Sequence, residues 1–175
     1  WFNAQNGDNS KYKHFQGDKR FAMNDFKEAF IVSVTDALDN HCNTLDLRVP
    51  LQCKFWIEEL PDQVQRFITF GGYRLYPDYI KVEQNNRTLT LFHSWKNYGV
   101  GVLPNNHPNW NYKYQVSFVL MNERQEIVFL HTEPEAEPSE WLKGMSYNYL
   151  SQFDIPAKLR GKYTLCVGLT DKTKK

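Results

Sequence analysis

Apolar residues recur at two different periods along this chain, and the change of period divides it into two parts. In residues 1–71 they recur at every third or fourth position, which predicts helices over 25–40 and 61–70. From residue 72 onward apolar and polar residues alternate, which is the period of a β-strand. The pattern therefore predicts two domains, residues 1–71 and residues 72–175.

The segment between the two predicted helices is less regular. Alternation of apolar and polar residues predicts a strand over 44–49 that Pro50 ends, whereas 51–60 fit either a strand or a helix. A helix, a strand, an uncertain element and a helix in succession are typical of a parallel α/β fold, yet they are too few to complete one. Residues 1–71 are therefore predicted to be the tail of a larger α/β domain, and Trp1 as the first residue predicts a piece of a longer protein.

Seven segments of the C-terminal part have strand periodicity and are separated by turn residues. About seven short strands in ~100 residues are the signature of an antiparallel, immunoglobulin-like β-sandwich. After the strand that ends at Trp95, Asn97 and Gly99 predict a bulge or tight turn where a positive φ costs little. The predicted strands are 73–76, 79–83, 88–95, 113–121, 126–131, 146–153 and 162–170. The predicted core residues are Leu91, Val116, Phe118, Leu165 and Val167, with Trp56 and Trp95 also buried. Trp141, which precedes a turn, is predicted to cap the sandwich or to dock it to the barrel.

Composition excludes several classes of protein. Apolar residues make up 41% of the chain and the net charge is +1, so a clustered basic face for nucleic acid is not expected. No apolar run approaches the ~18 residues of a membrane span. Three cysteines without a CxxC spacing, and five histidines without metal-ligand spacing, predict neither a metal site nor a disulfide framework. We therefore expect no cofactor, no nucleic-acid partner and no membrane span.

Several short motifs, spread over residues 71–171, carry a resemblance to a known family. The motifs are Gly72-Tyr73-Arg74-Leu75, Trp95-x-Asn97-x-Gly99, Tyr114-x-Val116-x-Phe118-x-Leu120, Glu140-Trp141-Leu142-x-Gly144 and Leu159-x-Gly161-Lys162-Tyr163-x-Leu165-x-Val167-Gly168-Leu169-x-Asp171. This part resembles the C-terminal β-sandwich of an uncharacterised family of bacterial glycoside-hydrolase-like proteins, in which the sandwich follows a TIM-barrel-like domain. The resemblance implies that residues 25–70 are the last elements of the barrel. It also implies an extracellular or periplasmic location.

The function expected from this resemblance is that of a non-catalytic accessory module, which supports the upstream barrel of the same chain and contacts carbohydrate. Two alternatives stay open. In the first, the chain contributes Asp46 or Arg48 to a sugar-cleaving site of the parent protein, since barrel chemistry lies at strand ends. In the second, the sandwich is a structural or adhesin-type interaction domain. Neither a carboxylate pair at glycosidase spacing nor a nucleophile elbow is recognisable, so catalytic residues stay unassigned.

An Asn-rich loop between residues 105 and 112, outside the family motifs, is the strongest candidate for binding. An exposed indole can pack on the apolar face of a sugar while side-chain amides bond its hydroxyl groups. The candidate carbohydrate-binding residues are Tyr98, Asn109, Trp110, Asn111 and Tyr112, and Asn105 and Asn106 add two further amides. In the alternative interpretation, Trp110 and Tyr112 fold back and cover the edge of the sandwich.

Overall fold

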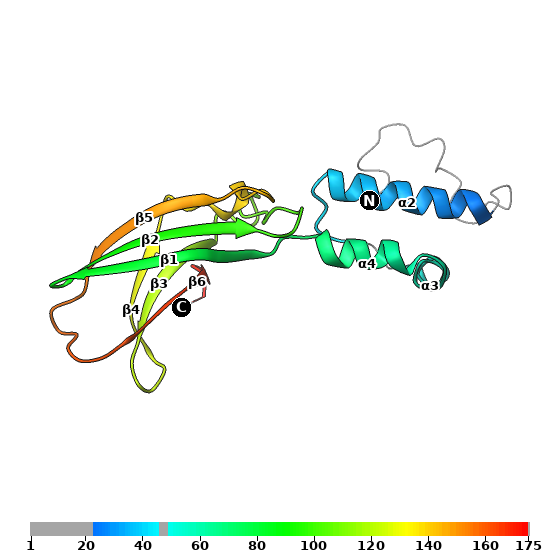
Figure 1. Ribbon diagram of the computed structural model, residues 1–175. Coiled ribbons are helices and arrows are strands. Elements are labelled where there is room, and N and C mark those ends of the chain that lie inside the picture. The colour runs from blue at the N-terminus through cyan, green and yellow to red at the C-terminus, as the bar shows by residue number, and fades with distance from the viewer. Residues whose placement is uncertain (1–22, 46–48, 175) are drawn as a thin grey trace. The chain divides into compact units, whose positions relative to one another are not determined.

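The computed structural model describes residues 23–45 and 49–174, and the chain divides into two compact units (Figure 1). The helical unit runs to Tyr73 and includes Gly99–Gly101. The β unit comprises Arg74–Tyr98 and the chain from Val102 onward. The division therefore falls two residues after the change of hydrophobic period.

Three helices make up the described part of the helical unit: α2 (Met23–Asp39), α3 (Pro50–Glu59) and α4 (Pro61–Phe70). The predicted helices correspond to α2 and α4, and the ambiguous segment is helical. The predicted strand over 44–49 is wrong at its described residues, Thr44, Leu45 and Val49, which are not in a strand; residues 46–48, with Asp46 and Arg48, lie outside the described residues. Pro50 begins α3 because its fixed φ suits the first helical position, where no N–H is required.

The helical unit has an apolar core of its own. Phe30 of α2 stacks on Trp56 of α3, with ring centroids 4.4 Å apart, and Phe67 of α4 is buried in the same cluster. Trp56 is thus a core residue, as its sequence context predicts. The helices pack on one another, and the described residues of this unit include no strand for them to cover.

Glycine is required at the two positions after β2 because two backbone segments approach each other closely there, and not because φ is positive. A Cβ atom at Gly99 would lie 1.9 Å from the carbonyl oxygen of Gly72, and one at Gly101 would lie 2.7 Å from the carbonyl carbon of Gly72. The chain bends at Gly99–Gly101, where a bulge or tight turn is predicted, but among the described residues of this region the positive φ belongs to Gly72, at +71°, and not to Asn97 or Gly99. The N–H of Gly101 donates to the carbonyl of Gly72 over 2.8 Å.

The β unit consists of two antiparallel three-stranded sheets. The first has the order β1-β2-β5, from β1 (Leu75–Asn85), β2 (Thr88–Asn97) and β5 (Tyr147–Asp154). The second has the order β4-β3-β6, from β3 (Tyr114–Met121), β4 (Ile127–Glu133) and β6 (Thr164–Asp171). A single turn of 3-10 helix, Pro138–Glu140, follows β4.

Of the two segments predicted as separate strands, 73–76 and 79–83, the part from Leu75 onward and the whole second segment form one strand, β1 (Leu75–Asn85), whereas Tyr73 and Arg74 precede it. Its register with β2 shifts between Pro77 and Tyr79. Because β1 is an edge strand, the missing N–H of Pro77 can be accommodated at this irregularity without loss of a central ladder bond. The proline therefore bends the strand instead of ending it.

One apolar core lies between the two sheets, which makes the β unit a sandwich. Leu91 from the first sheet and Val116 and Phe118 from the second are completely buried in it, and Leu165 and Val167 pack against it half-buried. The predicted core and its strand register are confirmed. Trp95 and Trp141 are buried too, with their rings stacked 5.0 Å apart.

The described helices are too short and too polar for any of them to cross a membrane.

Candidate functional site

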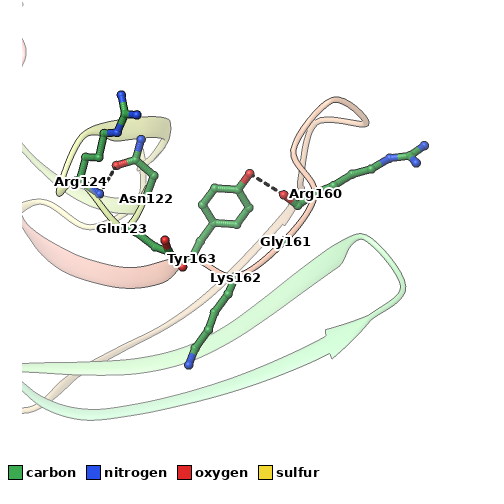
Figure 2. Close-up of a pocket in the computed structure, with 7 residues that line it drawn as sticks. All are labelled: Asn122, Glu123, Arg124, Arg160, Gly161, Lys162 and Tyr163. Atoms are coloured by element: carbon green, nitrogen blue, oxygen red, sulfur yellow. Dashed lines mark hydrogen bonds between the residues drawn. The ribbon is translucent and has the colours of Figure 1, made fainter.

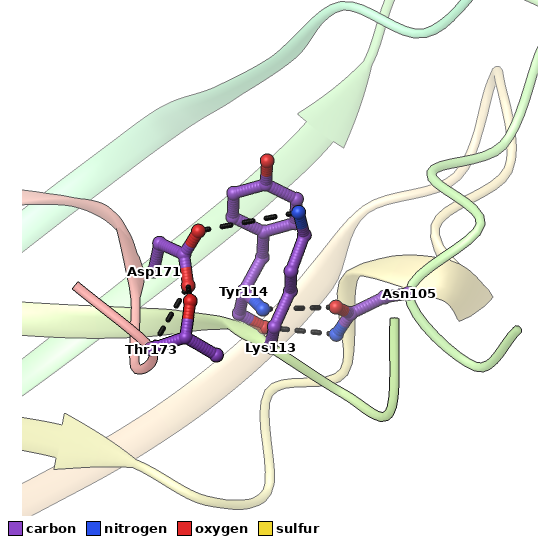
Figure 3. Close-up of polar contacts among 5 residues, drawn as sticks. All are labelled: Asn105, Lys113, Tyr114, Asp171 and Thr173. Carbon is purple, nitrogen blue, oxygen red and sulfur yellow. Dashed lines mark hydrogen bonds and ion pairs between the residues drawn. The ribbon is translucent and has the colours of Figure 1, made fainter. Parts of the chain in front are cut away.

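The candidate site is the segment that leads into β3, residues 103–113, hereafter the Trp110 loop. It is fastened at its start by Asn105, whose side chain is completely buried. The Nδ2 of Asn105 donates to the carbonyl of Tyr114 over 2.8 Å, and the N–H of Tyr114 donates to Oδ1 over 2.9 Å, as Figure 3 shows. Nδ2 also lies 3.0 Å from a carboxylate oxygen of Glu137. Asn105 is therefore used by the fold, and it is not an amide available to a ligand.

Lys113 fastens the other end of the Trp110 loop. Its ammonium group lies 4.0 Å from the carboxylate of Asp171 in β6 (Figure 3). The hydroxyl and N–H of Thr173 donate to that carboxylate, over 2.6 and 2.9 Å. These bonds, and then the charge of Lys113, lower the pKa of Asp171 below its ordinary value. This contact joins the loop to the last strand.

Trp110 is half-buried. Its exposure is therefore intermediate between that of an open binding platform and that of a side chain that covers the edge of the sandwich. Its ring meets Tyr114 edge-on, with centroids 5.4 Å apart at 70°. The ammonium group of Lys113 lies 4.7 Å from the indole centroid, a cation–π distance. These contacts orient the indole while leaving part of it open to solvent.

Tyr112 has the least ordinary backbone of the candidate residues. It and Asn111 have φ values of +53° and +48°, in the left-handed region. Asn tolerates that region, but a tyrosine there costs of order 1–3 kcal/mol and keeps this conformation only because the surrounding structure enforces it. The N–H of Tyr112 donates to the carbonyl of Asn105 over 2.8 Å, and its side chain is 48% exposed. The loop therefore holds an exposed phenol in a strained conformation.

Four of the five predicted binding residues are consecutive in the sequence, at 109–112, and all four are at least partly exposed on this loop. Asn109 and Asn111 are exposed beside Trp110 and Tyr112. Tyr98 instead stacks on Tyr76 of β1, with centroids 4.5 Å apart, and is 62% exposed. The hydrogen bond with Tyr98 raises the pKa of Tyr76 to about 12. Among the described ring contacts, none joins Tyr98 to the loop.

A buried chain of polar side chains crosses the sandwich core, and sequence patterns did not reveal it. The indole N–H of Trp95 donates to Nδ1 of His93 over 2.9 Å, so that nitrogen carries no proton. The proton of a neutral ring is then on Nε2, which lies 2.9 Å from the hydroxyl of Ser151. Ser151 in turn donates to the carboxylate of Glu133. His93, Ser151 and Glu133 are each at most 6% exposed.

The order of these bonds does not match that of a nucleophilic triad. In a nucleophilic triad the histidine accepts the serine proton and the carboxylate orients the histidine. Here His93 donates a hydrogen bond to the hydroxyl of Ser151, and that hydroxyl donates a hydrogen bond to the carboxylate of Glu133. The serine oxygen is not activated, and the group is buried. We therefore interpret it as a structural link between β2, β5 and β4.

This link predicts how stability depends on pH. Burial lowers the pKa of His93, against a smaller opposing effect of the Glu133 charge, and the pKa of His131 is lowered for the same reasons. The unfolded chain, with a histidine pKa of about 6.5, then binds more protons than the folded chain below that pH. The free energy of unfolding should therefore be highest above about pH 6.5 and fall as the pH is lowered through it.

Urea unfolding between about pH 8 and pH 5 tests this expectation. His93→Gln should lower stability at every pH but make the loss on acidification shallower, because one of the two shifted histidines is gone. An unchanged pH slope in that variant would show that His93 does not contribute.

An open pocket of about 380 Å³ lies beside the β3–β4 turn and the segment before β6 (Figure 2). Arg124, Arg160 and Lys162 supply three positive charges, and Glu123 supplies one negative charge. The hydroxyl of Tyr163 donates to the carbonyl of Arg160 over 3.0 Å. In Figure 2 the two guanidinium groups point away from each other, so the cations do not converge on one ligand position.

Taken together, the described residues define a mainly β protein: two antiparallel three-stranded sheets around one core, with a three-helix unit. They contain no group of His, Cys, Asp and Glu side chains that could hold a metal ion. No protein-family model, no curated protein and no solved structure matches the chain.

Proposed function

We propose that the β unit is a non-catalytic accessory module that contacts carbohydrate through the Trp110 loop. In this proposal it is an immunoglobulin-like sandwich of an extracellular or periplasmic glycoside-hydrolase-like protein, and the helical unit is the end of the barrel that it supports. The observation that carries the binding site is Tyr112, an exposed phenol in a left-handed backbone conformation. Strained backbone positions of this kind cluster at binding sites, because a conformation that lowers stability is retained where it positions a side chain for a ligand.

The neighbours of Tyr112 supply the chemistry that a sugar requires. The partly open indole of Trp110 offers an apolar surface for the C–H face of a pyranose ring. The amides of Asn109 and Asn111, both exposed, can donate to and accept from its hydroxyl groups. Because the loop is fastened through Asn105 and Lys113, little conformational entropy is lost on binding. A site of this size corresponds to affinities near the millimolar end of the scale.

Two substitutions test this proposal. Trp110→Ala should weaken binding of the recognised polysaccharide by about tenfold or more, while the sandwich stays folded. Tyr112→Gly should also weaken binding, but it should leave the free energy of unfolding unchanged or raise it by about 1 kcal/mol, because glycine adopts a positive φ without strain. Calorimetric titration with soluble glucans, xylans, mannans and galactans measures the first effect, and urea unfolding measures the second.

The Tyr98→Ala variant is the matched control, since it removes an exposed aromatic that is stacked away from the loop. Binding that depends on Tyr98 but not on Tyr112 would move the site to the Tyr76–Tyr98 pair. Absence of binding to every polysaccharide, together with a sharp loss of stability in Trp110→Ala, would show that the loop is a structural cover.

A further inference from the structure

Strand β1 is an edge strand of its sheet, and the part from Pro77 to Asn85 is not covered by other described residues. It pairs with β2 alone, and every residue from Pro77 to Asn85 is exposed. Ile80 and Val82 lie opposite His93 and Leu91, which are buried, so they belong to the core-facing side of the sheet. They are nevertheless 37% and 43% exposed. A long edge with apolar residues at that side is a surface on which another strand can add.

The turn that joins β1 to β2 shows which backbone groups face this open edge. Asn86 and Arg87 form a two-residue hairpin loop, and Asn85 pairs with Thr88 on either side of it. In such a hairpin the pair that flanks the loop exchanges both of its hydrogen bonds, and the bonded pairs then alternate along the ladder. The N–H and C=O groups of Ile80, Val82 and Gln84 therefore point away from β2, toward the open edge.

The side chains of β1 are complementary to β1 itself in one antiparallel register. With Val82 opposite Val82 of a second copy, Ile80 lies opposite Gln84, and the outward-pointing backbone groups meet. On the other face, Lys81 lies opposite Glu83 of the second copy, and Glu83 lies opposite Lys81. These two residues already form an ion pair of 2.7 Å within one copy, so four charges of alternating sign would lie together.

The neighbouring registers lack this complementarity. A slip of two residues in one direction sets Lys81 opposite Lys81 of the second copy, and a slip in the other direction sets Glu83 opposite Glu83. Like charges directly opposite each other destabilise an antiparallel pair. Charge therefore selects the register centred on Val82.

We propose that β1 pairs edge to edge with β1 of a second copy of this chain, which joins the two sheets into one of six strands. The pairing supplies partners for the backbone groups of Ile80, Val82 and Gln84. It also places an apolar neighbour beside Val82. This inference does not depend on the proposed carbohydrate function.

Charge reversal with restoration tests the pairing. Lys81→Glu and Glu83→Lys, each alone, set like charges opposite each other at two symmetric positions, and each should weaken the dimer by about tenfold. The double variant K81E/E83K restores opposite charges at both positions and should return the dissociation constant to within about threefold of the original. Sedimentation equilibrium over a range of concentrations measures the dissociation constant, and circular dichroism confirms that each variant is folded.

Lys158→Glu is the control, because it reverses an exposed charge on the segment before β6 and should leave the dimer unchanged. A folded chain that stays monomeric at millimolar concentration would overturn the proposal. So would a dimer that neither single reversal weakens, which would instead point to the exposed apolar residues of the helical unit, such as Leu51 and Ile57. A double variant that stays as weak as the single variants would overturn it as well.

Discussion

Replacement of Phe118 by alanine should lower the free energy of unfolding of the β unit by about 3–5 kcal/mol. Phe118 has no exposed surface and lies where the two sheets meet. Its ring contacts His93 of β2 edge-on, with centroids 5.0 Å apart, and stacks with Phe153 of β5 at 6.2 Å. Truncation leaves a cavity between rigid sheets that cannot collapse to fill it, and the cavity adds to the lost burial.

Phe92→Ala provides the matched control. Phe92 has the same side chain on a central strand, but it points to the outer face of its sheet and is 39% exposed. Its removal should cost less than about half as much, because part of its surface is already in water. Urea unfolding monitored by tryptophan fluorescence compares the two variants. Equal losses would mean that the sheets do not share a core at Phe118.

Replacement of Ser151 by alanine should cost at least about 2 kcal/mol, although only one oxygen atom is removed. The change deprives the buried carboxylate of Glu133 of its hydroxyl donor and leaves the Nε2–H of His93 without an acceptor. A buried group that loses its partner costs about 1–3 kcal/mol, and a charged group costs more.

Ser117→Ala is the comparison for this variant. Ser117 is equally buried, but its hydroxyl pairs with the neutral hydroxyl of Thr170 over 2.7 Å. Loss of a single neutral pair should cost about 1 kcal/mol. If the two serine variants lose the same free energy of unfolding in urea, the Glu133–Ser151–His93 chain contributes no more to stability than a single neutral hydrogen bond.

Alternation of apolar and polar residues was sufficient to predict much of the β unit. Each side chain of a strand points to the face opposite that of its neighbours, so Leu91, Val116 and Phe118 had to share the buried side if their segments were strands. Recurrence of apolar residues at every third or fourth position likewise predicted the helices α2 and α4, and the change between the two periods marked the change of architecture near residue 72. Periodicity could not show that 75–76 and 79–83 belong to one strand, because a proline at an edge strand and a proline between strands look alike in sequence.

The helical unit shows where local rules stop. Pro50 can end a strand or begin a helix, and residues 51–60 fit either element. In the structure the segment is a helix, and Trp56 stacks from it on Phe30 of α2 in the buried core. That contact joins residues 26 positions apart and has no local signature.

The candidate site divides in the same way. The sequence by itself determined that residues 105–112 combine an indole, a phenol and several amides in a segment unsuited to a core. Only the tertiary structure decided which amide is used by the fold and which remain exposed: Asn105 is buried because the backbone of Tyr114 and the carboxylate of Glu137 meet it there. It also decided the positive φ of Tyr112 and the link from His93 to Ser151, 58 positions away. Periodicity fixes the face on which a side chain lies, whereas hydrogen-bond partners are fixed by the packing of segments distant in sequence.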